Sequence, residues 1–152
     1  MKTSPAYLNL LGAWMGILLG FLSGLVLGLY FHRDDWLGGY GSLRRRLYRL
    51  AHISLFGLGV VNLCFYFTAQ HLPVGSLYFH LASWSFIAGA VLMPACCLLT
   101  AHLPSARLLF ALPVVSLLLG AVLTVGLLWH SDPSTGIDKP LLTAFTTPIQ
   151  SD

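Results

Sequence analysis

Histidine is the residue type in this sequence with the most capacity for chemistry, because six histidines occur in a chain of 152 residues with only 9% charged residues. Imidazole nitrogens ligate haem iron and copper. A bis-histidine haem b site needs two rings at matching depth on facing helices. His52 and His80 are the candidate haem ligands, and they are predicted to lie on opposite sides of the membrane. At the depth of each, the other predicted helices carry no residue of a type that ligates haem. Haem is therefore an alternative and not the default interpretation.

Copper is a second and less favoured cofactor. Met93 and Cys97 are four residues apart and share a helix face, and His102 ends the same predicted helix. Thioether and thiolate groups suit Cu(I). Pro94 would free a backbone carbonyl and could open a site here. Methionine and cysteine at helical spacing are also typical packing residues in a membrane core.

The sequence holds no other catalytic pattern. No nucleophile, base and orienting group occur at a catalytic spacing, and no carboxylate falls within the predicted spans. We therefore expect no enzyme activity unless a bound cofactor supplies it.

Composition indicates that lipid surrounds most of the chain. Hydrophobic residues make up 57% of the sequence and charged residues 9%, with a mean hydropathy of +0.79. A soluble domain has about 25% charged residues. These values exclude a soluble enzyme, a disulfide-stabilised secreted domain and most nucleic-acid binders.

Four uncharged runs are each long enough to cross a bilayer, which takes about 20 apolar residues in a helix. They span residues 8–31, 50–70, 77–101 and 108–129. Short turns between them favour antiparallel neighbours. The sequence predicts an all-α, integral membrane bundle of four transmembrane helices with short loops over residues 1–130. A proline-containing, irregular tail is expected over residues 131–152.

Basic residues predict the orientation of these spans. Short loops rich in Lys and Arg stay on the cytoplasmic side. Most basic residues lie between the first two spans, which places both termini on the outer (periplasmic) side of a bacterial inner membrane. This loop also indicates contact with lipid headgroups and a helix capped by Ser42. The residues assigned to topology and headgroup contact are Arg44, Arg45, Arg46 and Arg49.

Small residues predict where the helices meet. In lipid, close approach through small residues is a main source of helix association. The first span has a glycine at every fourth position, which forms a groove for another helix, either from this chain or from a partner. Ser116, Gly120 and Thr124 in the last span are a complement at the same spacing. The groove glycines are Gly12, Gly16, Gly20, Gly24 and Gly28.

A polar stripe on the second span predicts the face that points into the bundle. His52, Gly59, Tyr66 and Gln70 fall within about 40° of one another on the helical wheel. Asn62 lies about 80° from His52 on the same half. Polar groups at membrane depth need partners, so this face should be inside.

These features favour a non-catalytic accessory subunit or assembly factor of a larger membrane complex. The histidines suggest respiratory or haem-handling machinery. The partners would be the lipid bilayer and either another membrane protein or further copies of this chain, with no nucleic acid. The alternatives are a haem- or copper-binding membrane redox protein and a small transporter or channel, for which Pro94 and Pro113 are candidate irregularities.

Overall fold

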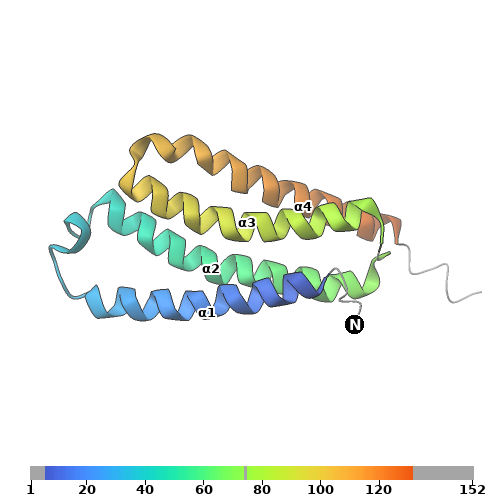
Figure 1. Cartoon of the computed structure of the whole chain (residues 1–152), viewed down its shortest axis with the longest axis horizontal. Coiled ribbons are helices and arrows are strands. Elements are labelled where there is room, and N and C mark those ends of the chain that lie inside the picture. The colour runs from blue at the N-terminus through green and yellow to red at the C-terminus, as the bar shows by residue number, and fades with distance from the viewer. Residues whose placement is uncertain (1–5, 74, 132–152) are drawn as a thin grey trace, which may run out of the picture.

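The computed structural model describes residues 6–73 and 75–131, which form four long helices with 3-10 turns between them (Figure 1). Each long helix is apolar and long enough to cross a membrane, and the described residues contain no strand. The prediction of four helices that are long and apolar enough to cross a membrane is confirmed, whereas the tail predicted over residues 131–152 lies almost entirely outside the described residues. The long helices are α1 (Tyr7–Tyr30), α2 (Leu43–Thr68), α3 (Leu77–His102) and α4 (Ala111–His130), and the 3-10 turns are η1 (Trp36–Gly38), η2 (Ala69–His71) and η3 (Pro104–Phe110).

Helix α2 begins at Leu43, seven residues before the predicted apolar span. The side chain of Ser42 accepts a hydrogen bond from the N–H of Arg45 at 3.2 Å, which confirms the predicted cap. The apolar span starts later than the helix because the first turns of α2 are basic. Helix α4 begins at Ala111, after the start of its apolar span, because the residues up to Phe110 form a 3-10 turn.

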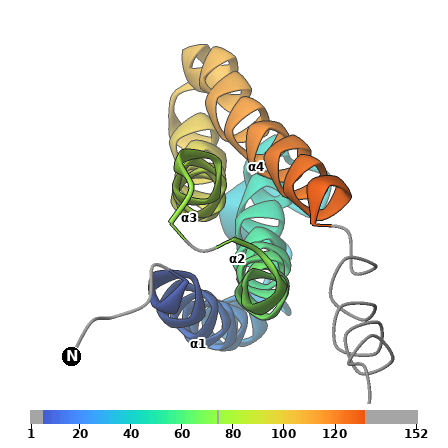
Figure 2. The ribbon, with the colours of Figure 1, turned by 90° about the vertical axis from the view of Figure 1, so that its right-hand side faces the viewer.

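The four helices form an open row. Helix α1 packs mainly on α2, α2 on α3, and α3 on α4. Seen end on, α1 and α4 therefore lie at opposite ends of the row (Figure 2). Helix α1 begins and α4 ends at the same end of the molecule, which we call the terminal end (Figure 1). The other end, which carries η1 and the start of α2, is called the arginine end.

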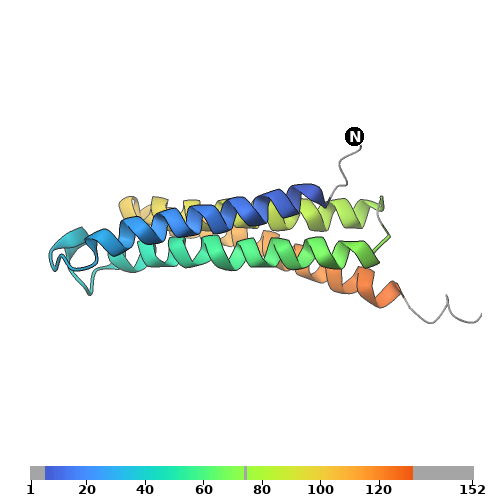
Figure 3. The same cartoon turned by 90° about the horizontal axis from the view of Figure 1, so that it is seen from below.

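The glycines of α1 let it approach α2 closely, and the two helices lie side by side (Figure 3). A Cβ added at Gly16 would lie 2.9 Å from the backbone oxygen of Leu55, so no larger residue fits there without movement of the backbone. Gly20 and Gly24 lie against aromatic side chains of α2. In contrast, a Cβ at Gly12 or Gly28 would meet no atom of the described residues within 4 Å. Helix α2 thus fills the middle of the groove and leaves its ends open.

The small residues of α4 pack against α3. The hydroxyl of Ser116 donates to the backbone oxygen of Ser85 at 2.7 Å, and a Cβ at Gly120 would lie 3.1 Å from the ring of Phe86. Thr124 bonds within its own helix to the oxygen of Gly120. The sequence suggested that these residues complement the glycines of α1, and that suggestion was wrong because α4 is separated from α1 by the rest of the row.

Three buried polar side chains join α1, α2 and α3 near the terminal end. The amide of Asn9 donates to the side-chain oxygen of Asn62 at 2.9 Å and to the backbone oxygen of Ser83 at 3.2 Å. The hydroxyl of Ser83 donates to the side-chain oxygen of Asn9. The amide of Asn62 also donates to the backbone oxygens of Leu58 and Phe86. This network satisfies polar groups that lipid could not, and it fixes the relative positions of the three helices.

The polar stripe of α2 is only partly inside. Gly59 is buried and His52 is half-buried, but Gln70 is exposed. Asn62, at the margin of the predicted stripe, is completely buried. The buried face of α2 differs from the predicted stripe because α2 packs against α1 on one side and against α3 on another. Residues at the margin of the stripe are therefore buried as well.

Neither proline marks a broken helix. Helix α3 continues through Pro94, and Pro113 lies in the first turn of α4, where proline is tolerated. The described residues therefore give the transporter alternative no discontinuous helix pair of the kind that transporters use around their substrates.

Replacement of Asn62 by alanine should lower the free energy of unfolding by about 1 to 2 kcal/mol, because it removes the acceptor of Asn9. The measurement is thermal or denaturant unfolding in detergent. Thr68→Ala is the control, because the Thr68 hydroxyl bonds only to Cys64 in its own helix. Equal losses in the two variants would contradict a structural role for the network.

Candidate functional site

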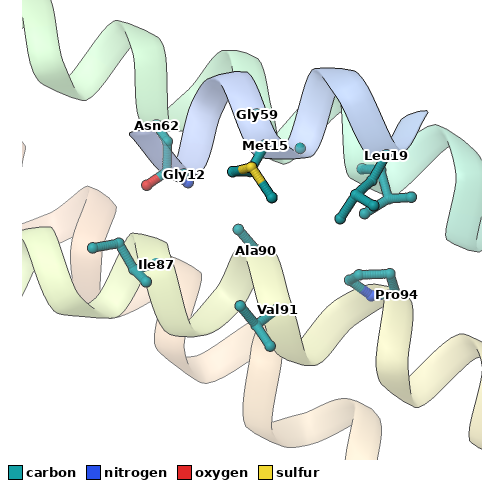
Figure 4. A pocket seen from close by; sticks show the side chains of 11 residues that line it. Gly12, Met15, Leu19, Gly59, Asn62, Ile87, Ala90, Val91 and Pro94 are labelled. Atoms are coloured by element: carbon teal, nitrogen blue, oxygen red, sulfur yellow. The ribbon is translucent and has the colours of Figure 1, made fainter. Parts of the chain in front are cut away.

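A cleft of about 240 Å³ separates α1 from α3, with α2 as its floor. Helices α1 and α3 touch at the Asn9 and Ser83 contact, and the cleft opens from Gly12 toward the arginine end. In Figure 4, Met15 and Leu19 of α1 face Ala90 and Pro94 of α3 across it. The lining residues are Gly12, Met15, Gly16, Leu19, Leu55, Gly59, Asn62, Ile87, Ala90, Val91 and Pro94.

The cleft opens to the outer surface of the helix row and its walls are apolar. Met15 is 48% exposed and Val91 64% exposed at its mouth. Asn62 is the one side chain with a hydrogen-bonding group among the lining residues, and its amide donates to backbone oxygens of α2 and α3. A ligand in this cleft would therefore be held by shape and apolar contact.

A second pocket, of about 290 Å³, continues the cleft toward the arginine end. The two pockets share Leu55 and Pro94 as lining residues. Ser23, Tyr48 and His52 also line the second pocket, but the surface that they and their neighbours present to it is almost entirely apolar. The combined cleft is thus apolar along its whole length.

His52 is the best-positioned candidate ligand in this cleft. Its Nδ1 lies 2.9 Å from the Ser23 hydroxyl oxygen, and the Ser23 hydroxyl donates its proton to the backbone oxygen of Gly20. Ser23 therefore orients the imidazole ring through its Nδ1. Nε2 has no hydrogen-bond partner among the described residues, and imidazole nitrogens ligate metals.

The predicted copper ligands do not share one site. Met93 and Cys97 lie on the same face of α3, but Cys97 is completely buried. His102 is five residues further on, about 140° around the helix, and its Nε2 lies 3.0 Å from the hydroxyl of Tyr48. Within residues 6–73 and 75–131, no three His, Cys, Asp or Glu side chains lie together as a metal would require.

His80 lies far from His52. His52 and Leu98 line the same pocket, and Leu98 is 18 residues after His80 on α3. At the helical rise of 1.5 Å per residue this separation is about 27 Å. His52 and His80 therefore cannot ligate the same haem. His102 lies closer to His52 than His80 does, because His102 is hydrogen-bonded to Tyr48 and Tyr48 precedes His52 by one helical turn.

Arg45 organises the arginine end and is not at the surface. The side chain is 1% exposed, and its guanidinium donates to the backbone oxygens of Phe31 at 2.7 Å and Arg33 at 3.5 Å. It also lies over the ring of Tyr40, 4.5 Å from the centroid. Phe31 follows the last residue of α1, so Arg45 satisfies a carbonyl that the helix leaves unpaired. This corrects the expectation that Arg45 contacts lipid headgroups.

The other three arginines of this group remain available at the surface. Arg44 and Arg46 are exposed, and Arg49 is half-buried with its guanidinium 5.7 Å from the Tyr40 ring. The sequence could not distinguish Arg45 from its neighbours, because burial depends on how the loop after α1 folds back over the start of α2.

Comparisons with protein-family models, with curated proteins and with solved structures found no match.

Replacement of Arg45 by alanine should lower the free energy of unfolding by about 2 to 3 kcal/mol, because it removes charged hydrogen bonds and cation–π contacts. The same variant should be cleaved faster by trypsin at Arg33, in the loop between α1 and α2. Arg46→Ala removes the same charge from an exposed position and is the control. Equal stability and equal proteolysis of the two variants would show that Arg45 does not hold the loop.

Proposed function

We propose that the protein is a non-catalytic accessory subunit or assembly factor that binds a transmembrane helix of a partner membrane protein in the cleft between α1 and α3. The observation that carries the proposal is the open cleft with an unoccupied glycine face. A Cβ at Gly12 would meet no atom of residues 6–73 and 75–131 within 4 Å, so alanine would fit there. Glycine inside a helix costs about 1 kcal/mol relative to alanine. Close approach of a second helix would give this glycine a role.

The cleft has the chemistry of a helix-packing surface. Gly12, Gly59 and Ala90 lie along it, and small residues allow backbones to approach in lipid. Its volume of about 240 Å³ suits the side chains along one face of a helix. The walls carry no charge, so the partner helix should present uncharged aliphatic side chains.

The membrane setting supports this role. The arginine-rich loop favours a cytoplasmic arginine end and a periplasmic terminal end in a bacterial inner membrane. Respiratory or haem-handling machinery is the proposed context, for which the histidines are the supporting feature. A second copy of this chain is the competing occupant of the cleft.

Gly12→Leu should fill the cleft and reduce recovery of the partner by about tenfold, since overpacking of this kind costs 1 to 3 kcal/mol. Gly28→Leu is the matched control, because Gly28 is equally open but does not line the cleft. The measurement is the size and composition of the particle isolated from source cells in mild detergent.

Wild type and Gly28→Leu should co-purify with a stoichiometric partner. A wild-type monomer would overturn the subunit proposal. A particle that contains only this chain would assign the cleft to self-association.

A second candidate function is a haem-binding redox protein. It is favoured by the Nε2 of His52, which has no hydrogen-bond partner in the described part of the chain, and by His102 near it. Haem iron would be ligated by His52, and electron transfer is the chemistry that it would supply. Ser23 would fix the ring, and the apolar cleft would limit water. This arrangement requires His102 to leave Tyr48 or a second ligand to come from the partner. Copper at Met93 and Cys97 is the weaker form of this candidate.

A visible spectrum and metal analysis of protein purified from source cells test this candidate. Bound haem b should give a Soret band that His52→Leu abolishes and His80→Leu retains, because only His52 faces the cleft. A wild-type protein with neither a Soret band nor stoichiometric copper would eliminate the candidate.

A further inference from the structure

A third pocket lies next to the cleft at the arginine end. It has a volume of about 390 Å³ and is bounded by the start of α2, the end of α3 and turn η1. His102 lines this pocket and is hydrogen-bonded to Tyr48, which lines the second pocket of the cleft. We call the three pockets together the α2 groove. Its lining residues on α2 extend from Asn62 to Arg44, which is about 27 Å at the helical rise.

Arg44 lies on the face of α2 that lines the cleft. At the helical period it is within about 40° of Tyr48, Leu55 and Asn62, which line the first two pockets. Arg46 is about 160° from Arg44 on the same helix. Both arginines are exposed, but only Arg44 lines a pocket of the groove. The groove is therefore apolar along the cleft and cationic at the arginine end.

The chain itself supplies no anion to this groove within the residues that the structure describes. No carboxylate lines any of the three pockets, and Asp34 and Asp35 belong to the exposed loop before η1. An occupant complementary to the groove has uncharged apolar groups along the cleft and a negative group beside Arg44.

The length of the groove favours a helix over a lipid as this occupant. The bilayer core is about 30 Å thick, so an acyl chain from one leaflet reaches about 15 Å into it. A lipid with its headgroup at Arg44 would therefore not reach Gly12, which lines the pocket at the far end. A transmembrane helix covers the whole length, and Gly12 allows its backbone to approach closely.

We propose, as an extension of the proposed function, that the partner helix carries Asp or Glu directly after its apolar span and pairs this carboxylate with Arg44. The ion pair fixes the depth at which the partner helix lies along α2. It also disfavours a helix with a basic residue at that position, because like charges repel.

Synthetic transmembrane helices test the pairing. Each has about 20 Leu and Ala residues and ends in Glu, Gln or Lys. They are titrated into the purified full chain in phosphatidylcholine vesicles, and binding is followed by energy transfer to a dye on Cys64, the exposed cysteine of α2. The Glu helix should bind about tenfold more tightly than the Gln helix, through a charged hydrogen bond, and the Lys helix should bind most weakly.

Two charge reversals localise the effect. Arg44→Glu should invert the preference, so that the Lys helix binds more tightly than the Glu helix. Arg46→Glu makes the same change of charge on another face of α2 and should alter each affinity by less than twofold. Equal shifts in the two variants would mean diffuse attraction to the basic loop and would overturn the proposal. Displacement of the Glu helix by phosphatidylglycerol would assign the groove to an anionic lipid and would also overturn it.

Gly12→Leu separates the carboxylate from the cleft. It should weaken all three helices by the same factor, because it fills the apolar part of the groove. If the three helices bind the wild type equally and Gly12→Leu weakens them, the helix site stands and the carboxylate pairing is wrong. If none of them binds the wild type, the pairing is wrong as well. The particle isolated from source cells then decides the proposed function independently.

Discussion

Helix association without a hydrophobic driving force is the constraint on which this structure depends. Lipid chains are as apolar as the side chains of α1, so α1 gains little from mere contact with α2. The contact at Gly16 brings the two backbones together, with a Cβ position only 2.9 Å from the oxygen of Leu55. The buried amides of Asn9 and Asn62 then add polar contacts that have no substitute in lipid.

This constraint also explains why the row is open and why a cleft exists. Close packing needs small residues, and α1 presents its small face to α2, while α4 presents its own to α3. Between α1 and α3 a direct polar contact is made by Asn9 and Ser83. Beyond that contact the two helices diverge, and their aliphatic side chains line a gap with α2 as its floor.

At the arginine end, a buried cation supplies the hydrogen bonds that backbone oxygens need. Arg45 donates to backbone oxygens after α1 and lies beneath aromatic rings, so the loop is folded around it. Arg44 and Arg46 are adjacent in sequence but point to the surface. One basic run therefore supplies both internal support of the loop, through Arg45, and exposed charge at the arginine end, through Arg44 and Arg46.

The sequence alone determined the four apolar helices, because their length and lack of charge leave few other structures in lipid. It also determined the Ser42 cap and the glycine spacing of α1, which are local properties. Tertiary structure decided which helix met those glycines, that Arg45 and not its neighbours was buried, and that Asn9 paired with Asn62. Asn9 was a detectable signal, a lone amide in an apolar helix, but its partner lies 53 residues away. The cleft could not be predicted, because it depends on where helices diverge and periodicity describes one helix at a time.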